Sequence, residues 1–179
     1  MKKIRNFVAI VMIIVLSGCS STQSLQEYYI DNTENPNFLH LDVPTSILNL
    51  EKADLTEIQR TALSSLKKLN ILAFKKTVDN TADYKVEKQQ VKAILSGDSY
   101  TELMKMNTDF GRATIKYLGE DDAIDEVIIY GDNDDKGFAL IRVLGNDMNP
   151  AHFIQLLQAV QKSDYNGEGL GELSSFFKG

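Results

Sequence analysis

The feature that most restricts the fold of this chain is a change in the spacing of its apolar residues near residue 99. From there the apolar side chains occupy every second position, as in half-buried β-strands, and no longer follow the helical period. The alternation predicts strands over about 102–106, 113–118, 127–130 and 138–144. The last two are joined by Gly131–Gly137, whose composition is typical of a hairpin loop. Strands in such close succession indicate an antiparallel meander.

Further elements precede and follow the meander. The sequence predicts strands at 38–43 and 69–74, a helical turn through Ile47, Leu48 and Leu50, and helices at 54–68, 81–96, from 149 onward and at about 170–177. Asp54 and Glu57 form a capping-box-like pair at the start of the first helix. Asn149 followed by Pro150 marks another helix start, because proline lacks the amide hydrogen that would be unpaired there.

The order β-α-β-α-β-β-β-β-α predicts an α+β fold, with a mainly antiparallel sheet and helices packed on one face. No repeat or long Pro/Gly-rich linker divides residues 25–179, so we expect a single domain. The strand at 138–144 is apolar on both faces and is therefore expected to be central. Helices or the N-terminal segment cover its second face, or that face forms a half-open groove that docks another protein. The sequence allows both.

The first 18 residues have the pattern of a secretory signal peptide. Lys2, Lys3 and Arg5 precede the apolar run Phe7–Leu16, which is too short for a membrane span of about 20 residues. The sequence Leu-Ser-Gly-Cys that ends at Cys19 resembles a bacterial lipobox, in which the cysteine thiol receives a diacylglyceryl group. We therefore expect a signal peptide at 1–18, lipid attachment at Cys19 and a polar tether through residue 24.

Location and partners follow from the same segment and from the charge. By resemblance to such lipoproteins, the lack of an acidic residue directly after Cys19 implies outer-membrane attachment, facing the periplasm. The chain without its signal peptide keeps 16 Lys and Arg against 25 Asp and Glu, a net charge of about −9. This acidity argues against nucleic acid as a partner. Because the sole cysteine is expected to carry the lipid, we expect neither a disulfide nor a cysteine-based metal site. We also expect no cofactor.

Two acidic stretches are weak candidates for a cation site. Asp132–Gly137 begins like a calcium-binding EF-hand loop, but Lys136 and Val143 stand where the loop requires oxygen ligands. The candidate residues in the two stretches are Asp121, Asp122, Asp125, Asp132 and Asp134. Solvated turns are the simpler interpretation, for Gly119–Glu126 as for the hairpin loop. Contact with a cation or a basic partner is the alternative.

The chain offers little for catalysis. His40 lies in a predicted strand and His152 in the first turn of a predicted helix, and both are expected to be structural or at the surface. No serine stands in a GxSxG turn, and Gly167–Gly171 lacks the GxGxxG spacing of a nucleotide-binding loop. We therefore expect a protein that is not an enzyme.

Five stretches of the sequence together carry a resemblance to a known family. They are the lipobox, LNILAFKK at 69–76, YTELMKMNT at 100–108, RATIKYLGEDDAIDEVIIYGD at 112–132 and KGFALIRVLGNDMNP at 136–150. In these the chain resembles an uncharacterised lipoprotein family of Bacteroidota, known as domain of unknown function 4252. The likeness covers nearly all of residues 24–178. It implies the same compartment and a single domain, and it brings no catalytic or ligand residues.

The sequence thus predicts a lipid-anchored, non-enzymatic envelope protein whose domain binds another envelope protein in the periplasm. The alternative is a periplasmic carrier that holds a lipid, peptide or other small apolar ligand. An apolar cavity lined by residues such as Tyr84, Tyr117 or Phe153 would favour the carrier. A filled core with an exposed apolar patch would favour partner binding.

Overall fold

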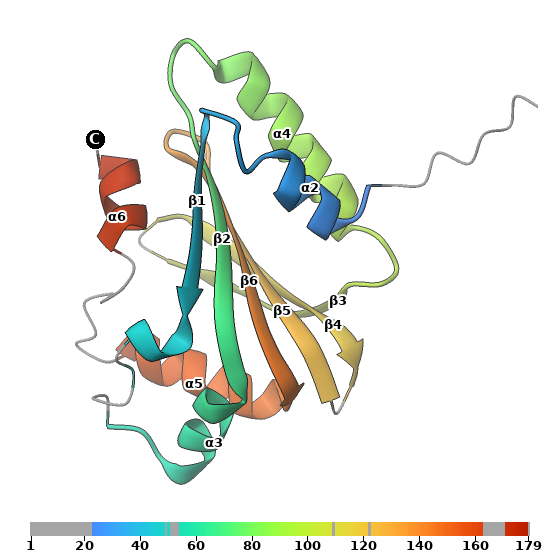
Figure 1. Ribbon diagram of the computed structural model, residues 1–179, viewed down its shortest axis with the longest axis vertical. Helices are drawn as coiled ribbons and strands as arrows, with labels where there is room; N and C mark the ends of the chain where they lie inside the picture. The colour runs from blue at the N-terminus through green and yellow to red at the C-terminus, as the bar shows by residue number, and fades with distance from the viewer. Residues whose placement is uncertain are drawn as a thin grey trace, which may run out of the picture.

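The computed structural model describes residues 23–48, 50, 54–108, 110–121, 123–162 and 171–178. They form a six-stranded antiparallel sheet in the order β1-β2-β6-β5-β4-β3, flanked by helices (Figure 1). The strands are β1 (Phe38–Pro44), β2 (Leu66–Lys75), β3 (Thr101–Asn107), β4 (Arg112–Glu120), β5 (Ala123–Asn133) and β6 (Gly137–Met148). The helices are α2 (Leu25–Asp31), the 3-10 turn η1 (Thr45–Leu48), α3 (Glu57–Ser65), α4 (Thr81–Leu95), α5 (Pro150–Lys162) and α6 (Gly171–Lys178). The α+β fold is confirmed, and the predicted strands and helices follow one another in the predicted order.

The strand order follows from the meander. Helix α4 carries the chain from the end of β2 to the far edge of the sheet, where β3 begins (Figure 1). Three hairpins then return the chain to β6, which pairs with both β5 and β2 and is central, as predicted. The edges of the sheet are β1 and β3, and β3 has a bulge between Glu102 and Met104.

One face of the sheet, which we call the α4 face, lies under α2 and α4 and has a closely packed core. Leu72, Phe74, Phe138 and Leu140 are fully buried in it. The rings of Phe74 and Phe138 stack with their centroids 5.6 Å apart. Among the described residues, the only partly buried apolar side chain packed against this core is that of Tyr100. The α4 face is therefore almost completely covered.

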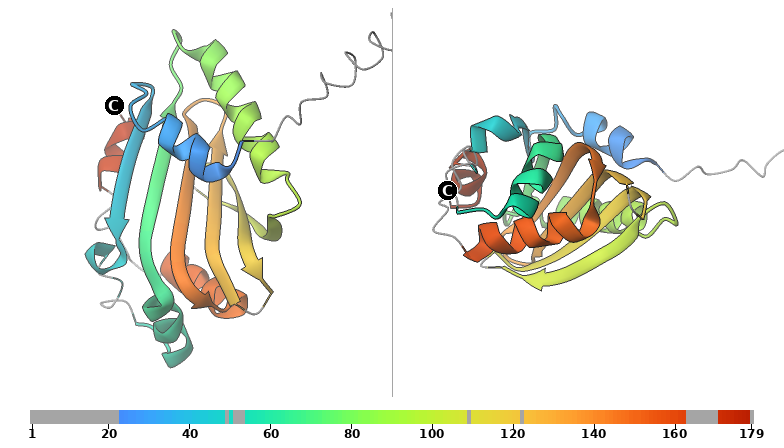
Figure 2. Two further views of the ribbon diagram at one scale, coloured as in Figure 1. Left: turned by 45° about the vertical axis from the view of Figure 1, so that its right-hand side comes forward. Right: turned by 90° about the horizontal axis from the view of Figure 1, so that it is seen from below.

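The opposite face, which we call the α5 face, is covered less completely. Figure 2 shows α5 and α2 on opposite sides of the sheet. Ile71, Ile115, Val127 and Val143 form the core of this face together with Phe153 of α5. Eleven further apolar residues of the described chain pack against that core and remain only partly buried. Helices thus lie on both faces instead of one as expected, because the central strands are apolar on both sides and each side requires a cover.

The start and end of α3 differ from the sequence prediction. The helix begins after Thr56, whose hydroxyl accepts a hydrogen bond from the Gln59 amide while the Gln59 side chain accepts one from the Thr56 amide. This complete capping box places the helix start two residues after the predicted cap, Asp54. The helix ends at Ser65, because Leu66 has an extended backbone (φ −83°, ψ 141°) and begins β2.

Helix α2 was not predicted, and it attaches the start of the described chain firmly to the domain. The Ser24 hydroxyl accepts a hydrogen bond of 3.2 Å from the Glu27 amide, and the Glu27 carboxylate accepts one of 2.8 Å from the Ser24 amide. Gln23 donates to the Asp31 carboxylate at 2.6 Å and accepts from the Gln90 side chain of α4 at 2.6 Å. The chain is therefore fixed to the domain from Gln23 onward.

Candidate functional site

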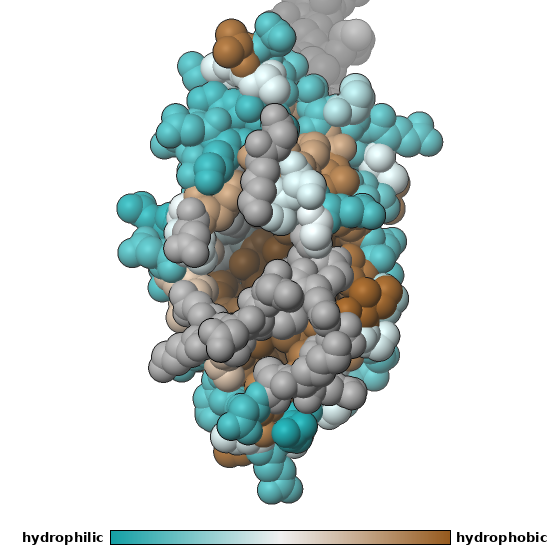
Figure 3. All heavy atoms as spheres, turned by 90° about the vertical axis from the view of Figure 1, so that its left-hand side faces the viewer, coloured by the Kyte–Doolittle hydropathy of each residue, from teal (hydrophilic) through white to brown (hydrophobic). Residues whose placement is uncertain are grey.

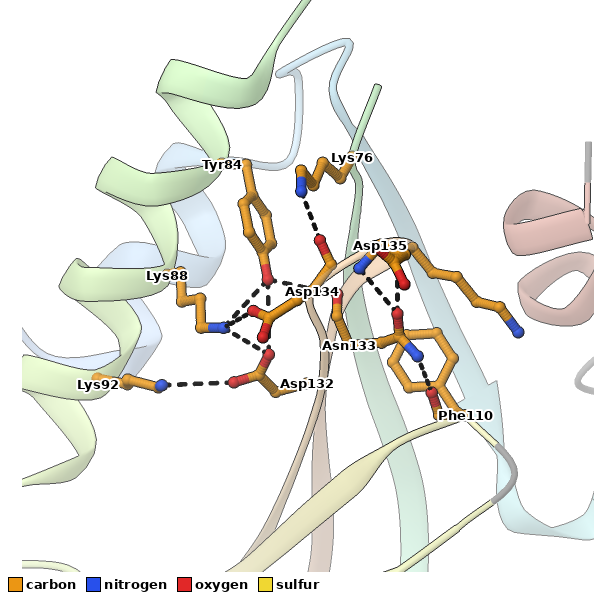
Figure 4. A network of polar contacts seen from close by, with 10 residues as sticks. Lys76, Tyr84, Lys88, Lys92, Phe110, Asp132, Asn133, Asp134 and Asp135 are labelled. Carbon is orange, nitrogen blue, oxygen red and sulfur yellow. Dashed lines mark hydrogen bonds and ion pairs between the residues drawn. The ribbon is translucent and has the colours of Figure 1, made fainter. Parts of the chain in front are cut away.

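Carboxylates of the β5–β6 hairpin form a network with lysines of α4 (Figure 4). The ammonium of Lys88 lies 2.7 Å from a carboxylate oxygen of Asp132 and 2.7 Å from one of Asp134. Lys92 lies 3.3 Å from the other oxygen of Asp132. Lys88 also donates a hydrogen bond of 3.2 Å to the hydroxyl of Tyr84, which donates to the Asn133 carbonyl at 3.3 Å. The network joins the middle of α4 to the tip of the sheet.

These contacts determine the charge state of the hairpin. Desolvation alone would lower the pKa of Lys88, but its hydrogen bonds to Asp132 and Asp134 outweigh this effect and raise the pKa. Lys88 is therefore charged throughout the physiological range. Asp132 and Asp134, the two candidate cation ligands at this end of the sheet, are therefore already paired with the ammonium group of Lys88.

Acid is expected to weaken this network. The hydrogen bond from Lys88 lowers the pKa of Asp134 below its ordinary value of 3.8. A carboxylate with a lowered folded-state pKa contributes stability above its unfolded pKa, and this contribution is lost as the pH falls through the folded value. The difference in unfolding free energy between wild type and Lys88→Met should therefore shrink below about pH 4. Urea unfolding at a series of pH values measures it, with the exposed Lys85→Met on the same helix as control. A difference that stayed constant down to pH 2 would contradict the role of Asp134.

The other acidic candidates lie at the opposite end of β5. Asp121, in the β4–β5 turn, accepts a hydrogen bond of 2.6 Å from the Tyr117 hydroxyl. Asp125 is exposed on β5, and Asp122 lies outside the described residues. The two acidic stretches are therefore not combined into one patch. Within the described ranges, no three His, Cys, Asp or Glu side chains are grouped so that they could hold a metal ion.

Glu126 is not part of a solvated turn, contrary to the prediction. It belongs to β5, is 6% exposed and forms two hydrogen bonds with Arg142 of β6, Nε to Oε1 at 2.6 Å and Nη2 to Oε2 at 2.8 Å. Alternation along β5 places Glu126 on the same face as Ile128 and Tyr130, the α4 face, where Arg142 also lies. The register shift between Ile124 and Glu126 instead places Ile124 in the core of the α5 face. The guanidinium carbon is 6.0 Å from the centroid of the Tyr29 ring of α2. Hydrogen bonds to Glu126 raise the pKa of Arg142 further, so this is a buried pair of opposite charges.

The two histidines lie on different elements. His40 is in β1, where its ring contacts that of Tyr29 with centroids 4.9 Å apart and its Nε2 lies 3.9 Å from Asp42. His152 is half-buried in the first turn of α5, and its amide donates to the Asn149 side chain at 3.1 Å, as the predicted helix cap requires. Of the glycine-rich stretch, residues 167–170 lie outside the described residues and Gly171 begins α6.

An apolar groove lies on the α5 face, between α5 and the strands β3, β4 and β5. Its volume is about 580 Å³, and it is lined by Met106, Asn107, Thr108, Ala113, Ile129, Leu157 and Val160. Met106, Ile129 and Leu157 are only partly buried. Figure 3 looks onto a side of the molecule where apolar surface gathers around a hollow. The sequence analysis predicted none of these residues to line a groove; the apolar second face of the strand at 138–144 was its one indication that a groove exists.

The residues that were expected to line a carrier cavity are instead part of filled cores. Tyr84, Tyr117 and Phe153 are 4%, 6% and 4% exposed. Tyr84 belongs to the core of the α4 face, and Tyr117 and Phe153 belong to that of the α5 face. Because the sheet separates Tyr84 from the other two, these three side chains do not line a common cavity.

The predicted signal peptide and Cys19 lie outside the described residues. None of the helices in the described part of the chain has both the length and the apolar character needed to cross a membrane. A family model described as Domain of unknown function (DUF4252) matches residues 28–156. This match confirms the resemblance of the strand sequences to that family. No curated protein and no solved structure matches the chain.

Proposed function

The chain belongs to the family described as Domain of unknown function (DUF4252), and from its own chemistry we propose that it is a lipid-anchored binding protein of the cell envelope. In this proposal Cys19 carries the lipid, and the domain is not an enzyme but docks an envelope protein through the groove on its α5 face. The supporting observation is the unequal cover of the two faces of the sheet. The α4 face is almost closed, whereas apolar side chains of the α5 face remain partly exposed around an open groove.

The apolar character of the groove supports a protein partner. Partly exposed apolar surface is costly in water, and contiguous patches of it mark interaction sites on soluble domains. Met106 and Leu157 stand on two different elements, β3 and α5, and both contribute to the groove. Methionine adapts its shape to a partner more readily than branched side chains do. A partner segment with two or three apolar side chains would complete the cover of the α5 face.

A charge in the groove is expected to release the partner. Met106→Glu and Leu157→Glu should each lower the yield of the complex at least about tenfold, because burying one such side chain contributes about 1.5–3 kcal/mol. The measurement is native mass spectrometry of the lipidated protein, extracted gently from its own envelope. A second polypeptide at fixed stoichiometry is expected with wild type and not with either variant.

The matched control is Ile58→Glu on α3. Ile58 is also apolar and is 45% exposed, but it is not among the residues that line the groove. This variant should keep the partner. Circular dichroism and thermal unfolding establish that all three variants remain folded. A partner retained in full by both groove variants would contradict the proposed docking surface.

The second candidate is a carrier, and the volume of the groove favours it. Pockets that hold small molecules enclose about 300–1,000 Å³, and this groove falls in that range. In the same experiment a carrier would show a small additional mass that is lost on unfolding, and no second polypeptide. The partly exposed state of Met106, Ile129 and Leu157 favours the protein partner, since carriers bury most of their ligand.

A further inference from the structure

We propose that the domain rests on the bilayer with its α2–α4 layer, so that the groove on the α5 face opens away from the membrane. This inference rests on the proposed lipid at Cys19. It adds to the proposed function the side of the domain from which the partner approaches. It begins from the position at which the chain joins the folded domain. Gln23 is hydrogen-bonded to Asp31 of α2 and to Gln90 of α4, and Ser24 caps α2.

The length of chain between lipid and domain is therefore small. Only Ser20, Ser21 and Thr22 separate Cys19 from Gln23. A fully extended chain advances about 3.3–3.6 Å per residue, so the two Cα atoms are at most about 14 Å apart. A lipid inserted in the bilayer keeps Cys19 at the headgroups. The start of α2 is thus held within about one helix diameter of the membrane, since a helix with its side chains is about 10–12 Å across.

The helix layer that holds this attachment point carries exposed apolar side chains. Ile30 on α2 is 61% exposed and Val86 on α4 is 59% exposed. Val78, in the loop that leads into α4, is 93% exposed. These are three of the five large apolar side chains that are exposed in the described part of the chain, and all three belong to the α2–α4 layer or its entry loop. Contact with the interfacial region of a bilayer would remove this apolar surface from water.

The groove lies on the other side of the sheet. Ala113 and Ile129 line it from the α5 face, whereas α2 and α4 pack on the α4 face. Figure 2 shows the sheet between α2 and α5. With α2 and α4 on the membrane, the helix layer and the sheet both separate the groove from the bilayer. The groove is then accessible to a protein in the aqueous space and not to lipids of the membrane that carries the anchor.

A pair of single-cysteine variants tests this orientation, because lipidation leaves Cys19 without a free thiol. Val86→Cys on α4 and Ile58→Cys on α3 place one fluorescent label each at exposed positions. The lipidated full chains are reconstituted into vesicles of phosphatidylethanolamine and phosphatidylglycerol that carry a nitroxide on the headgroup. We expect the label at position 86 to be quenched severalfold more than the label at position 58. Equal quenching, or stronger quenching at position 58, would overturn the orientation.

Two controls separate the causes. Flotation of the vesicles reports the lipid anchor itself, and a chain that did not float would refute the anchor and with it this inference. Equal quenching with full flotation would refute only the orientation. Inserting about 20 Gly and Ser residues after Thr22 adds a span of about 25 Å. The insertion should bring the quenching at position 86 close to that at position 58. An unchanged ratio of quenching at the two positions would show that the short tether does not cause the orientation.

Discussion

Replacement of Cys19 by alanine is expected to abolish stable membrane attachment. Without the thiol, no acyl chain is added, and each buried methylene group of such a chain contributes about 0.8 kcal/mol to membrane binding. The protein should therefore move from the membrane pellet to the soluble fraction, or remain as a precursor that is heavier by the 18 residues of the predicted signal peptide. Ultracentrifugation of cell lysates and intact-mass measurement of each fraction distinguish these results.

Ser20→Ala is the matched control for this prediction. It changes the neighbouring residue to alanine and keeps the thiol, so it should remain in the membrane fraction with its acyl mass. A Cys19→Ala protein found in the membrane fraction at the mass of the mature chain would refute lipid anchoring at this residue. It would leave the described fold unaffected, since every described residue follows position 22.

Removal of one partner of the buried ion pair should destabilise the domain far more than removal of a charge at its surface. The side chains of Arg142 and Glu126 are 11% and 8% exposed. Glu126→Ala leaves the guanidinium buried without its counter-charge, which typically costs about 3–5 kcal/mol. That is a large part of the stability of a domain of this size, which is about 5–15 kcal/mol. Urea unfolding of the mature chain measures the loss.

Two further variants show whether burial is the cause. Glu102→Ala removes a carboxylate that also forms an ion pair, with Lys105 at 3.0 Å, but at the surface of β3. It should cost about 1 kcal/mol or less. The double variant Glu126→Leu/Arg142→Met replaces both charges with apolar groups and should recover most of the loss. A double variant as unstable as Glu126→Ala would mean that the pair itself, and not an unpaired charge, determines the stability.

The succession of strands and longer helices along the chain was predictable because the sequence signals for each element are local. Alternation identified the four strands of the meander, and Asn149 with Pro150 identified the start of α5, where the predicted cap is present. Helix α2 has only seven residues, too few to show a helical period, and its burial depends on distant partners. The Tyr28 hydroxyl, for example, donates to Glu87, which is 59 residues further along the chain.

The buried ion pair, the hairpin network and the groove were less predictable because they depend on where strands begin and on long-range pairing. Glu126 appears in the sequence as the end of an acidic turn because the predicted strand began at Val127. The strand begins at Ala123, and alternation then places Glu126 on the α4 face with Ile128. Lys88 and Asp132 are 44 residues apart, so no local pattern pairs them. The groove arises from the position of α5, which covers part of a face whose apolar side chains extend further. A sequence shows that such a face exists but not how much of it a helix leaves exposed.

In the proposed anchored state, the two edge strands determine how neighbouring copies behave when they are confined to a surface. In two dimensions molecules meet often, and an exposed strand edge would let one sheet extend into the next. Here β1 ends at Pro44, which has no amide to donate, and β3 is interrupted by its bulge and bears the Glu102–Lys105 ion pair. Prolines, bulges and charges at edges prevent such lateral polymerisation. Copies held on a membrane by the proposed anchor would therefore remain separate units, each with its groove available.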